Sequence, residues 1–103
     1  MIREQAITEF TPSADVTIWD VRDSSAYQQG HIKYAAHQPL DSLTPALLAD
    51  TQGAVYVLCG GGTKAGKAAD KLNSFDDSRD IVILTGGTRG AKAAGMKIVS
   101  EEN

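Results

Sequence analysis

The chain has 103 residues, which suffices for one domain, and its 42% hydrophobic and 22% charged residues are typical of a globular protein. Its formal net charge of −3 argues against a general binder of nucleic acids or anionic membranes, because such proteins carry a basic field. The single cysteine excludes an internal disulfide, and one cysteine with two histidines cannot complete a thiolate zinc site. No metal ion and no other cofactor is therefore expected.

The beginning of the chain does not look like a targeting segment. Arg3 and Glu4 stand where a secretory signal would need an apolar stretch. No segment approaches the roughly 18 apolar residues that span a bilayer. We therefore expect a cytoplasmic protein in which residues 1–103 form a single domain and the lone thiol stays reduced.

Short apolar runs predict the strands. The runs at residues 54–58 and 81–84 are continuous and rich in valine and isoleucine, which is typical of strands buried on both faces of a parallel sheet. Another run at residues 16–21 predicts a third strand, and residues 5–10 are expected to add a strand at the edge of the sheet.

Helical patterns alternate with these runs. The clearest covers residues 64–73 and has one apolar stripe, made of Ala65, Ala68, Ala69 and Leu72. Shorter helices are predicted at residues 23–29, 42–50 and 87–94. The alternation of strand and helix predicts an α/β domain with right-handed crossovers.

Cys59 directly follows the apolar run at residues 54–58, and the loop Gly60-Gly61-Gly62-Thr63-Lys64 leads from it into the clearest helix. In an open α/β sheet, ligands bind at the carboxyl ends of the strands. Three glycines allow successive N–H groups to point inward as an anion nest, and the helix N-terminus and Lys64 add positive charge. These surroundings favour the thiolate, so Cys59 is predicted to be a nucleophile rather than a buried structural cysteine.

Three chemistries compete as interpretations of this loop. A nucleotide-binding P-loop matches residues 61–67, but Ala68 stands where that motif needs Ser or Thr to hold Mg²⁺. A cysteine phosphatase needs an arginine six residues after its cysteine to clamp phosphate, and Ala65 occupies that position. Sulfur transfer through a persulfide needs only a compact loop of N–H donors, and it fits the residues best.

Three segments of the chain resemble the rhodanese family of sulfurtransferases, and together they cover almost the whole sequence. Asp20-Val21-Arg22 with Gly30-His31-Ile32 resembles the family's first block, D-V-R followed by G-H-I-P-G-A. Cys59 and its loop resemble the active-site pattern C-x-x-G-x-[RKTS]. Leu84-Thr85-Gly86-Gly87, followed by Ala94-Gly95, resembles the closing block of the family.

The resemblance implies a rhodanese-like α/β fold, in which helices flank a central parallel sheet on both faces. It also implies that Cys59 carries a persulfide in a cradle formed by the backbone N–H groups of Gly60, Gly61, Gly62, Thr63 and Lys64. The loop from Cys59 to Lys64 has six residues, a length that in this family goes with sulfur substrates, whereas a loop one residue longer goes with phosphatases.

The resemblance further implies thiosulfate or 3-mercaptopyruvate as the donor, and a thiol, cyanide or a small redox protein as the acceptor. The alternative is a non-catalytic rhodanese-like module that senses sulfur or binds a protein. Lys33-Tyr34 replaces the family's Pro-Gly, and Thr88 and Ala91 replace frequent aromatic residues, so the acceptor stays open. A monomer or homodimer is expected, with no nucleic-acid or membrane partner.

Arg22 follows the predicted strand at residues 16–21, which places it at the same sheet edge as Cys59. It is a candidate substrate-binding residue that steers an anionic donor, and an ion pair with a nearby carboxylate is an equally good interpretation. His31 is expected to be a turn residue bonded to backbone, because a thiolate held by a nest of N–H groups needs no general base.

Overall fold

A five-stranded parallel sheet forms the centre of the fold. The computed structural model describes residues 1–100 of the chain. The strands of this sheet are β1 (Ile2–Ala6), β2 (Thr17–Asp20), β4 (Ala36–His37), β5 (Val55–Leu58) and β6 (Ile81–Thr85). They lie in the order β1-β6-β5-β2-β4, and every neighbouring pair is parallel. All five carboxyl ends therefore meet at one edge of the sheet.

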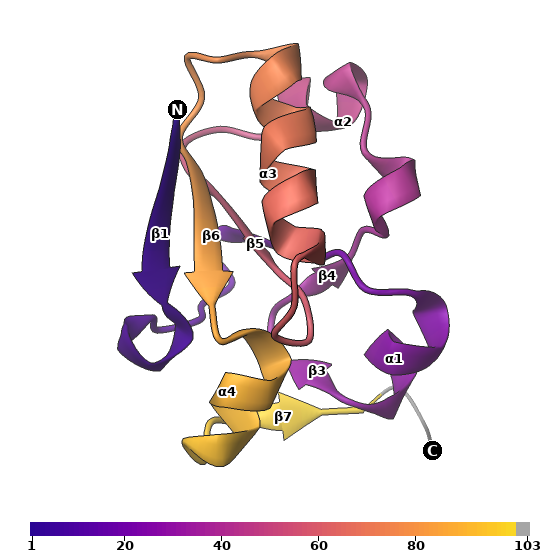
Figure 1. Ribbon diagram of the computed structural model, residues 1–103, viewed down its shortest axis with the longest axis vertical. Helices are drawn as coiled ribbons and strands as arrows, with labels where there is room; N and C mark the ends of the chain where they lie inside the picture. The colour runs from indigo at the N-terminus through magenta and orange to yellow at the C-terminus, as the bar shows by residue number, and fades with distance from the viewer. Residues whose placement is uncertain (101–103) are drawn as a thin grey trace.

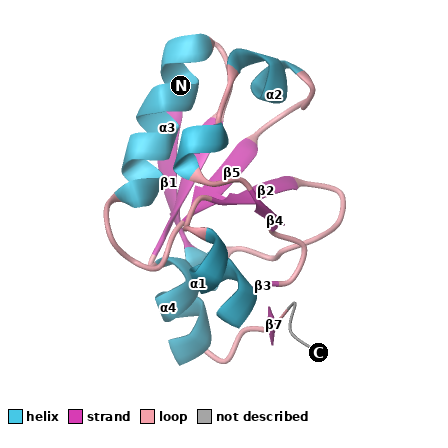
Figure 2. Ribbon diagram, turned by 90° about the vertical axis from the view of Figure 1, so that its right-hand side faces the viewer, coloured by secondary structure: helices cyan, strands magenta, loops and turns pink. Residues whose placement is uncertain are grey.

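Within residues 1–100, three α-helices lie between these strands and a fourth follows the last of them (Figure 1). They are α1 (Ser24–Gln29), α2 (Pro45–Ala49), α3 (Lys64–Phe75) and α4 (Gly87–Ala93). Short 3-10 turns at Ile7–Glu9 and Leu40–Ser42 and a small antiparallel pair, β3 (His31–Ile32) with β7 (Ile98–Val99), complete the structure. Figure 2 places α2 and α3 at one end of the molecule and α1 and α4 at the other, where the strands end.

Side chains from both faces of the sheet are buried. On one face, Trp19 and Val57 pack with the apolar stripe of α3. On the other face, Ile18 and Leu58 pack with Ala91 of α4 and with the turn that follows β1. Because successive side chains of a strand point to opposite faces, the continuous apolar runs serve both layers, and the predicted flanking of the sheet on both faces is confirmed.

The two short helices near the sheet begin at polar caps. The Asp23 carboxylate accepts a hydrogen bond from the Ala26 N–H group at 3.1 Å, and α1 starts at the next residue, Ser24. Thr44 accepts from the Leu47 N–H group in the same way, with proline at the first turn of α2. The cap at Asp23 also fixes its carboxylate beside the carboxyl ends of the strands.

The three predicted strands at 16–21, 54–58 and 81–84 and the four predicted helices are present, with small shifts at their ends. The predicted edge strand at residues 5–10 is wrong in its position. The strand runs from Ile2 to Ala6 beside β6, and Ile7 then turns into the core, where its exposed fraction is 1%. Within residues 1–100, no helix is long and apolar enough to cross a membrane.

Candidate active site around Cys59

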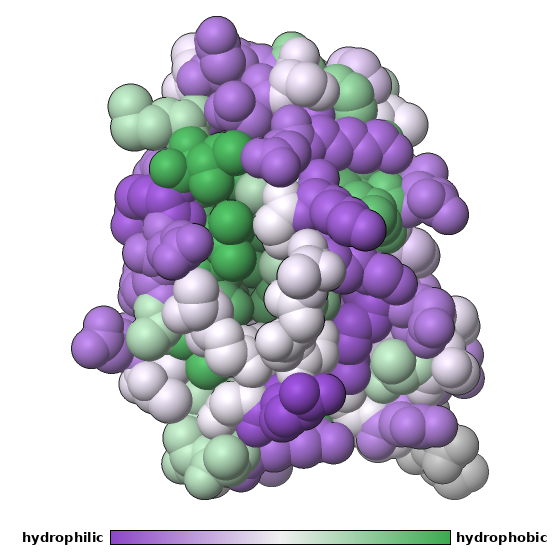
Figure 3. Space-filling model, in the orientation of Figure 1, coloured by the Kyte–Doolittle hydropathy of each residue, from purple (hydrophilic) through white to green (hydrophobic). Residues whose placement is uncertain are grey.

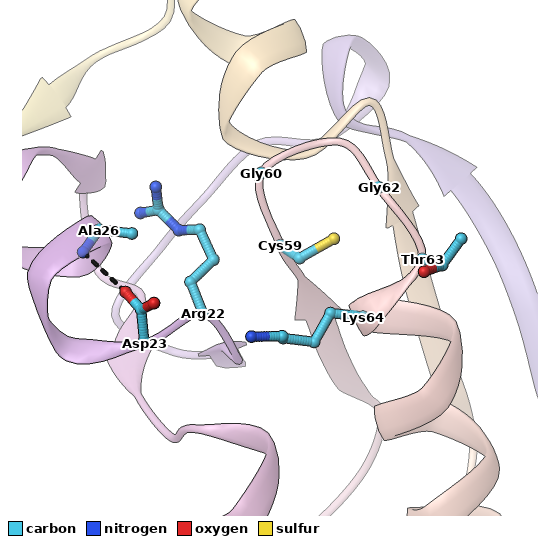
Figure 4. A pocket seen from close by; sticks show the side chains of 8 residues that line it. All are labelled: Arg22, Asp23, Ala26, Cys59, Gly60, Gly62, Thr63 and Lys64. Atoms are coloured by element: carbon cyan, nitrogen blue, oxygen red, sulfur yellow. Dashed lines mark hydrogen bonds between the residues drawn. The ribbon is translucent and has the colours of Figure 1, made fainter.

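Cys59 lies directly after β5 and is buried, with an exposed fraction of 5%. The loop that follows it turns back on itself, and α3 begins at Lys64. Figure 4 shows the Cys59 side chain directed into the ring of this loop, between Gly60 and Gly62. The sulfur atom therefore stands at the carboxyl edge of the sheet, inside the loop that the sequence predicted to surround it.

The start of α4 fixes the orientation of the loop. The Thr88 N–H group donates to the Cys59 carbonyl at 2.9 Å, and the Arg89 N–H group donates to the Gly60 carbonyl at 3.1 Å. In a planar trans peptide the carbonyl and the following N–H group point in opposite directions. The N–H groups of Gly60 and Gly61 therefore point away from the N–H groups that hold these carbonyls.

The N–H groups of the loop are left without partners. Within residues 1–100, no N–H group from Gly60 to Thr63 donates a hydrogen bond. Lys64 adds a further one, because the first N–H groups of a helix have no acceptor within the helix. The loop thus offers several backbone donors to an anion without any change in its own hydrogen bonds.

The close approach of α4 to the loop depends on glycine. Gly86 and Gly87 have φ angles of 90° and 56°, a backbone region that residues other than glycine rarely adopt. A Cβ atom on Gly87 would stand 2.1 Å from the Cys59 carbonyl oxygen and 2.9 Å from the Gly61 nitrogen. A side chain at residue 87 would therefore force α4 and the loop apart.

A cavity of about 290 Å³ opens on one side of the loop; we call it the charged pocket. It is lined by Arg22, Asp23, Ala26, Cys59, Gly60, Gly62, Thr63 and Lys64. The structure thus brings together in one cavity every predicted site residue except Gly61. Figure 4 shows the Lys64 amine directed across this pocket toward Asp23.

Asp23 lines this pocket, although the sequence analysis did not include it among the candidate site residues. The N–H group of Ala26, the Ser25 hydroxyl and the charge of Lys64 lower the pKa of Asp23 below its usual value. The carboxylate is therefore ionised at neutral pH, and its negative charge partly offsets the positive charge of Lys64 and Arg22 in the pocket. Its position in the sequence, directly after Arg22, was the available signal.

The guanidinium of Arg22 is bound by the carboxylate of Asp20, the last residue of β2. This guanidinium makes a bidentate pair with Asp20, with Nη2 at 2.7 Å from the carboxylate, and also donates to the Gly30 carbonyl at 2.7 Å. Asp20 has an exposed fraction of 0%, so this pair is structural. Arg22 nevertheless lines the charged pocket and contributes positive charge there.

A second cavity of about 330 Å³ lies on the other side of the loop and also includes Cys59. Gly61 lines this one, together with Ile83 and Leu84 of β6, and Glu4 is the charged residue at its wall. Figure 3 shows the hydrophobic surface along β6 beside α3. The two cavities that reach Cys59 therefore differ in charge, and the cations are on the side of Lys64.

Neither histidine lines the two cavities that contain Cys59. Nδ1 of His31 lies 2.8 Å from the Tyr27 carbonyl, which confirms the predicted bond to backbone, but His31 begins strand β3 and is not a turn residue. Nε2 of His37 donates to the Arg22 carbonyl at 3.0 Å. Both rings are stacked on Tyr27, so they support the loop that carries Arg22 rather than act as a base for Cys59.

A family model and solved structures of other proteins both match this chain. The chain matches the family model described as rhodanese-like domain over residues 5–94. The rhodanese-like domain of the Alr3790 protein from Anabaena sp. is 30% identical with a TM-score of 0.72, and the match covers 82% of this chain and 65% of that one. No curated protein sequence matches this chain.

Two further solved structures share the fold. Thiosulfate sulfurtransferase from Pseudomonas aeruginosa is 26% identical with a TM-score of 0.71, and the match covers 85% of this chain but 17% of that one. A rhodanese-related protein from Thermoplasma volcanium is 23% identical with a TM-score of 0.70, and the match covers 84% of this chain and 85% of that one.

The contact between α4 and the loop predicts the effect of Gly87→Ala. The variant adds a steric clash with the Cys59 carbonyl to the cost of a positive φ, which is about 1–2 kcal/mol for a residue other than glycine. Gly95→Ala is the matched control, because Gly95 has a φ of 79° but no atom within 4 Å of its Cβ position. Denaturant unfolding should show a loss for Gly87→Ala that exceeds the control by about 1–3 kcal/mol. Equal losses would contradict the tight contact.

Proposed function

Because the chain belongs to the rhodanese-like domain family, we propose that it is a sulfurtransferase in which Cys59 carries the transferred sulfur as a persulfide. The observation that supports this most is the loop around the Cys59 side chain, whose N–H groups from Gly60 to Thr63 have no partner among residues 1–100. Such donors stabilise a thiolate before the reaction and the charged outer sulfur of a persulfide after it.

In the first half-reaction, the Cys59 thiolate attacks the outer sulfur of thiosulfate. A bond forms between the Cys59 sulfur and that sulfur, and the sulfur–sulfur bond of thiosulfate breaks. Its electron pair leaves with sulfite, and the negative charge of the persulfide remains in the loop. The step needs no metal ion and no redox cofactor, because the electrons are balanced between the two sulfur compounds.

The charged pocket is the entrance that suits an anionic donor. Lys64 and Arg22 provide positive charge beside Cys59, whereas the second cavity has Glu4 at its wall. Since Arg22 is paired with Asp20, Lys64 is the cation with the greater freedom to pair with the donor. The same two groups would hold the leaving sulfite.

In the second half-reaction, a thiol or cyanide attacks the outer sulfur of the persulfide. The bond between that sulfur and Cys59 breaks, and the Cys59 thiolate is restored in its ring of N–H donors. The enzyme thus alternates between a free and a loaded form, which predicts ping-pong kinetics.

Intact mass before and after thiosulfate tests this proposal. Reduced wild-type protein should gain the mass of one sulfur atom, and cyanide should remove it with the release of thiocyanate. Cys59→Ser is the control and should gain nothing, because it has no thiol. A wild-type protein that gains no sulfur from thiosulfate or 3-mercaptopyruvate would overturn the proposal. Full loading with turnover at the background rate would favour a non-catalytic sulfur-binding module.

Two substitutions test the role of the charged pocket, one that removes a positive charge and one that removes a negative charge. Lys64→Gln should raise the KM for thiosulfate by about two- to fivefold, and Asp23→Asn should lower it by a similar factor, since both groups are exposed. Asparagine keeps the helix cap while it removes the negative charge that persists at neutral pH. Steady-state rates at saturating cyanide give the KM for thiosulfate of each variant. The differences from the wild-type KM should become smaller at high salt. Changes of the same sign in both variants would contradict this assignment.

A further inference from the structure

A third cavity, of about 200 Å³, lies on the α4 side of the loop; we call it the α4 pocket. It is lined by Arg22, Gly60, Thr88, Arg89 and Lys92. Three of these five residues are cations, and no carboxylate of residues 1–100 lines the cavity. Arg22 and Gly60 also line the charged pocket, so the two cavities are neighbours that share one wall.

Contacts with the backbone locate these cations. Nη1 of Arg89 lies 3.6 Å from the position that a Cβ atom on Gly61 would take, so its guanidinium lies against the loop. Nζ of Lys92 lies 3.8 Å from the corresponding position on Gly30, whose carbonyl binds Arg22. The three positive groups thus surround one side of the loop, and Figure 3 shows strongly hydrophilic surface at the level of α4.

Two of the three cations of the α4 pocket, Arg89 and Lys92, have no partner that neutralises them within residues 1–100. Within residues 1–100, the side chains of Arg89 and Lys92 make no ion pair and no hydrogen bond, in contrast to Arg22 with Asp20. The hydroxyl of Thr88, which has an exposed fraction of 2%, likewise has no hydrogen-bond partner in this part of the chain. A buried hydroxyl without a partner is unfavourable, and an anion is the ligand that both features fit.

The position of the α4 pocket excludes thiosulfate as that anion. The charged oxygen atoms of thiosulfate are only two bonds away from the outer sulfur that Cys59 attacks. Cys59 lines the charged pocket but not the α4 pocket, so a group bound between Arg89 and Lys92 is separated from the reacting sulfur by Gly60. The ligand must therefore be longer than the donor, with its charge remote from its reactive atom.

We propose that the α4 pocket binds a carboxylate of the thiol that accepts sulfur from Cys59, an inference that rests on the proposed function. The acceptor's thiolate attacks the outer sulfur of the persulfide, and the bond between that sulfur and Cys59 breaks. The acceptor leaves as a persulfide, the electron pair returns to Cys59 as a thiolate, and no oxidant or reductant is required. Arg89 and Lys92 hold the remote carboxylate and so raise the affinity for acidic thiols.

Discharge of preloaded protein by matched acceptors tests the proposal. The acceptors are the tripeptide thiol glutathione, its diethyl ester, which lacks free carboxylates, and cyanide. In the double variant Arg89→Gln/Lys92→Gln, the second-order rate with glutathione should fall about tenfold, because two charge-assisted contacts are lost. The rates with the ester and with cyanide should fall much less than the glutathione rate, since neither acceptor has a carboxylate for these side chains to bind.

Lys67→Gln/Lys97→Gln is the control variant. It removes the same total charge from exposed residues that do not line the α4 pocket, so the glutathione rate should stay close to that of the wild type. An equal fall for glutathione and its ester, or a fall in the control as large as in the double variant, would overturn the proposal. Discharge of wild-type protein by cyanide separates this failure from that of the proposed function, which would abolish loading itself.

A binding measurement without sulfur transfer completes the test. S-methylglutathione, which has the carboxylates but no thiol, is titrated into Cys59→Ser while the amide resonances of Gly60, Thr88 and Arg89 are followed. These resonances should shift. When Arg89→Gln and Lys92→Gln are combined with Cys59→Ser, the affinity for S-methylglutathione should fall about tenfold. Shifts confined to other residues, or an affinity that the double variant leaves unchanged, would overturn the assignment of the site.

Discussion

Two hydrogen bonds between α4 and the loop after β5 determine the site. The N–H groups of Thr88 and Arg89 hold the carbonyls of Cys59 and Gly60, and the planar peptide then turns the loop's own N–H groups the other way. Gly87 allows this contact, because no Cβ atom fits between α4 and the Cys59 carbonyl. A cysteine at the end of a buried strand is thereby surrounded by donors that nothing else in the described chain uses.

The charges around this loop have separate tasks. Arg22 neutralises the buried Asp20, and loss of one partner of such a pair costs about 3–5 kcal/mol, because a charge is left buried alone. A substitution at Arg22 would therefore report on folding before it reports on substrate. Lys64 has no such buried partner, and in the neighbouring α4 pocket Arg89 and Lys92 are likewise unpaired within residues 1–100. The chain is acidic as a whole, and yet cations gather on two sides of the loop.

The sequence allowed prediction of the features that depend on local pattern. The continuous apolar runs indicated β5 and β6, the small apolar stripe indicated α3, and the glycines between them indicated the loop and its nucleophile. Arg22, Lys64 and Cys59 were placed at one edge because the carboxyl ends of parallel strands meet there. The order of residues along the chain sufficed for these inferences.

Features that depend on contacts between distant residues could not be predicted from the sequence. The strands β3, β4 and β7 have two residues each, too few for any periodicity, and they form only through their partners. The support of the loop by α4 joins residues about thirty positions apart, and it is made by backbone groups whose direction no residue type specifies. Tyr34 has a φ of 78°, a value that its residue type alone does not suggest.

The central claim is that the loop's N–H groups bind the charge carried by Cys59, and amide resonances before and after loading with thiosulfate test it most directly. On formation of the persulfide, the amide protons of Gly60 to Lys64 should shift downfield, because they gain a charged acceptor. Those of Thr88 and Arg89 should keep their positions, since they stay bonded to the carbonyls of the loop. Loading of Cys59 that leaves the amide protons of the loop unshifted would contradict the account.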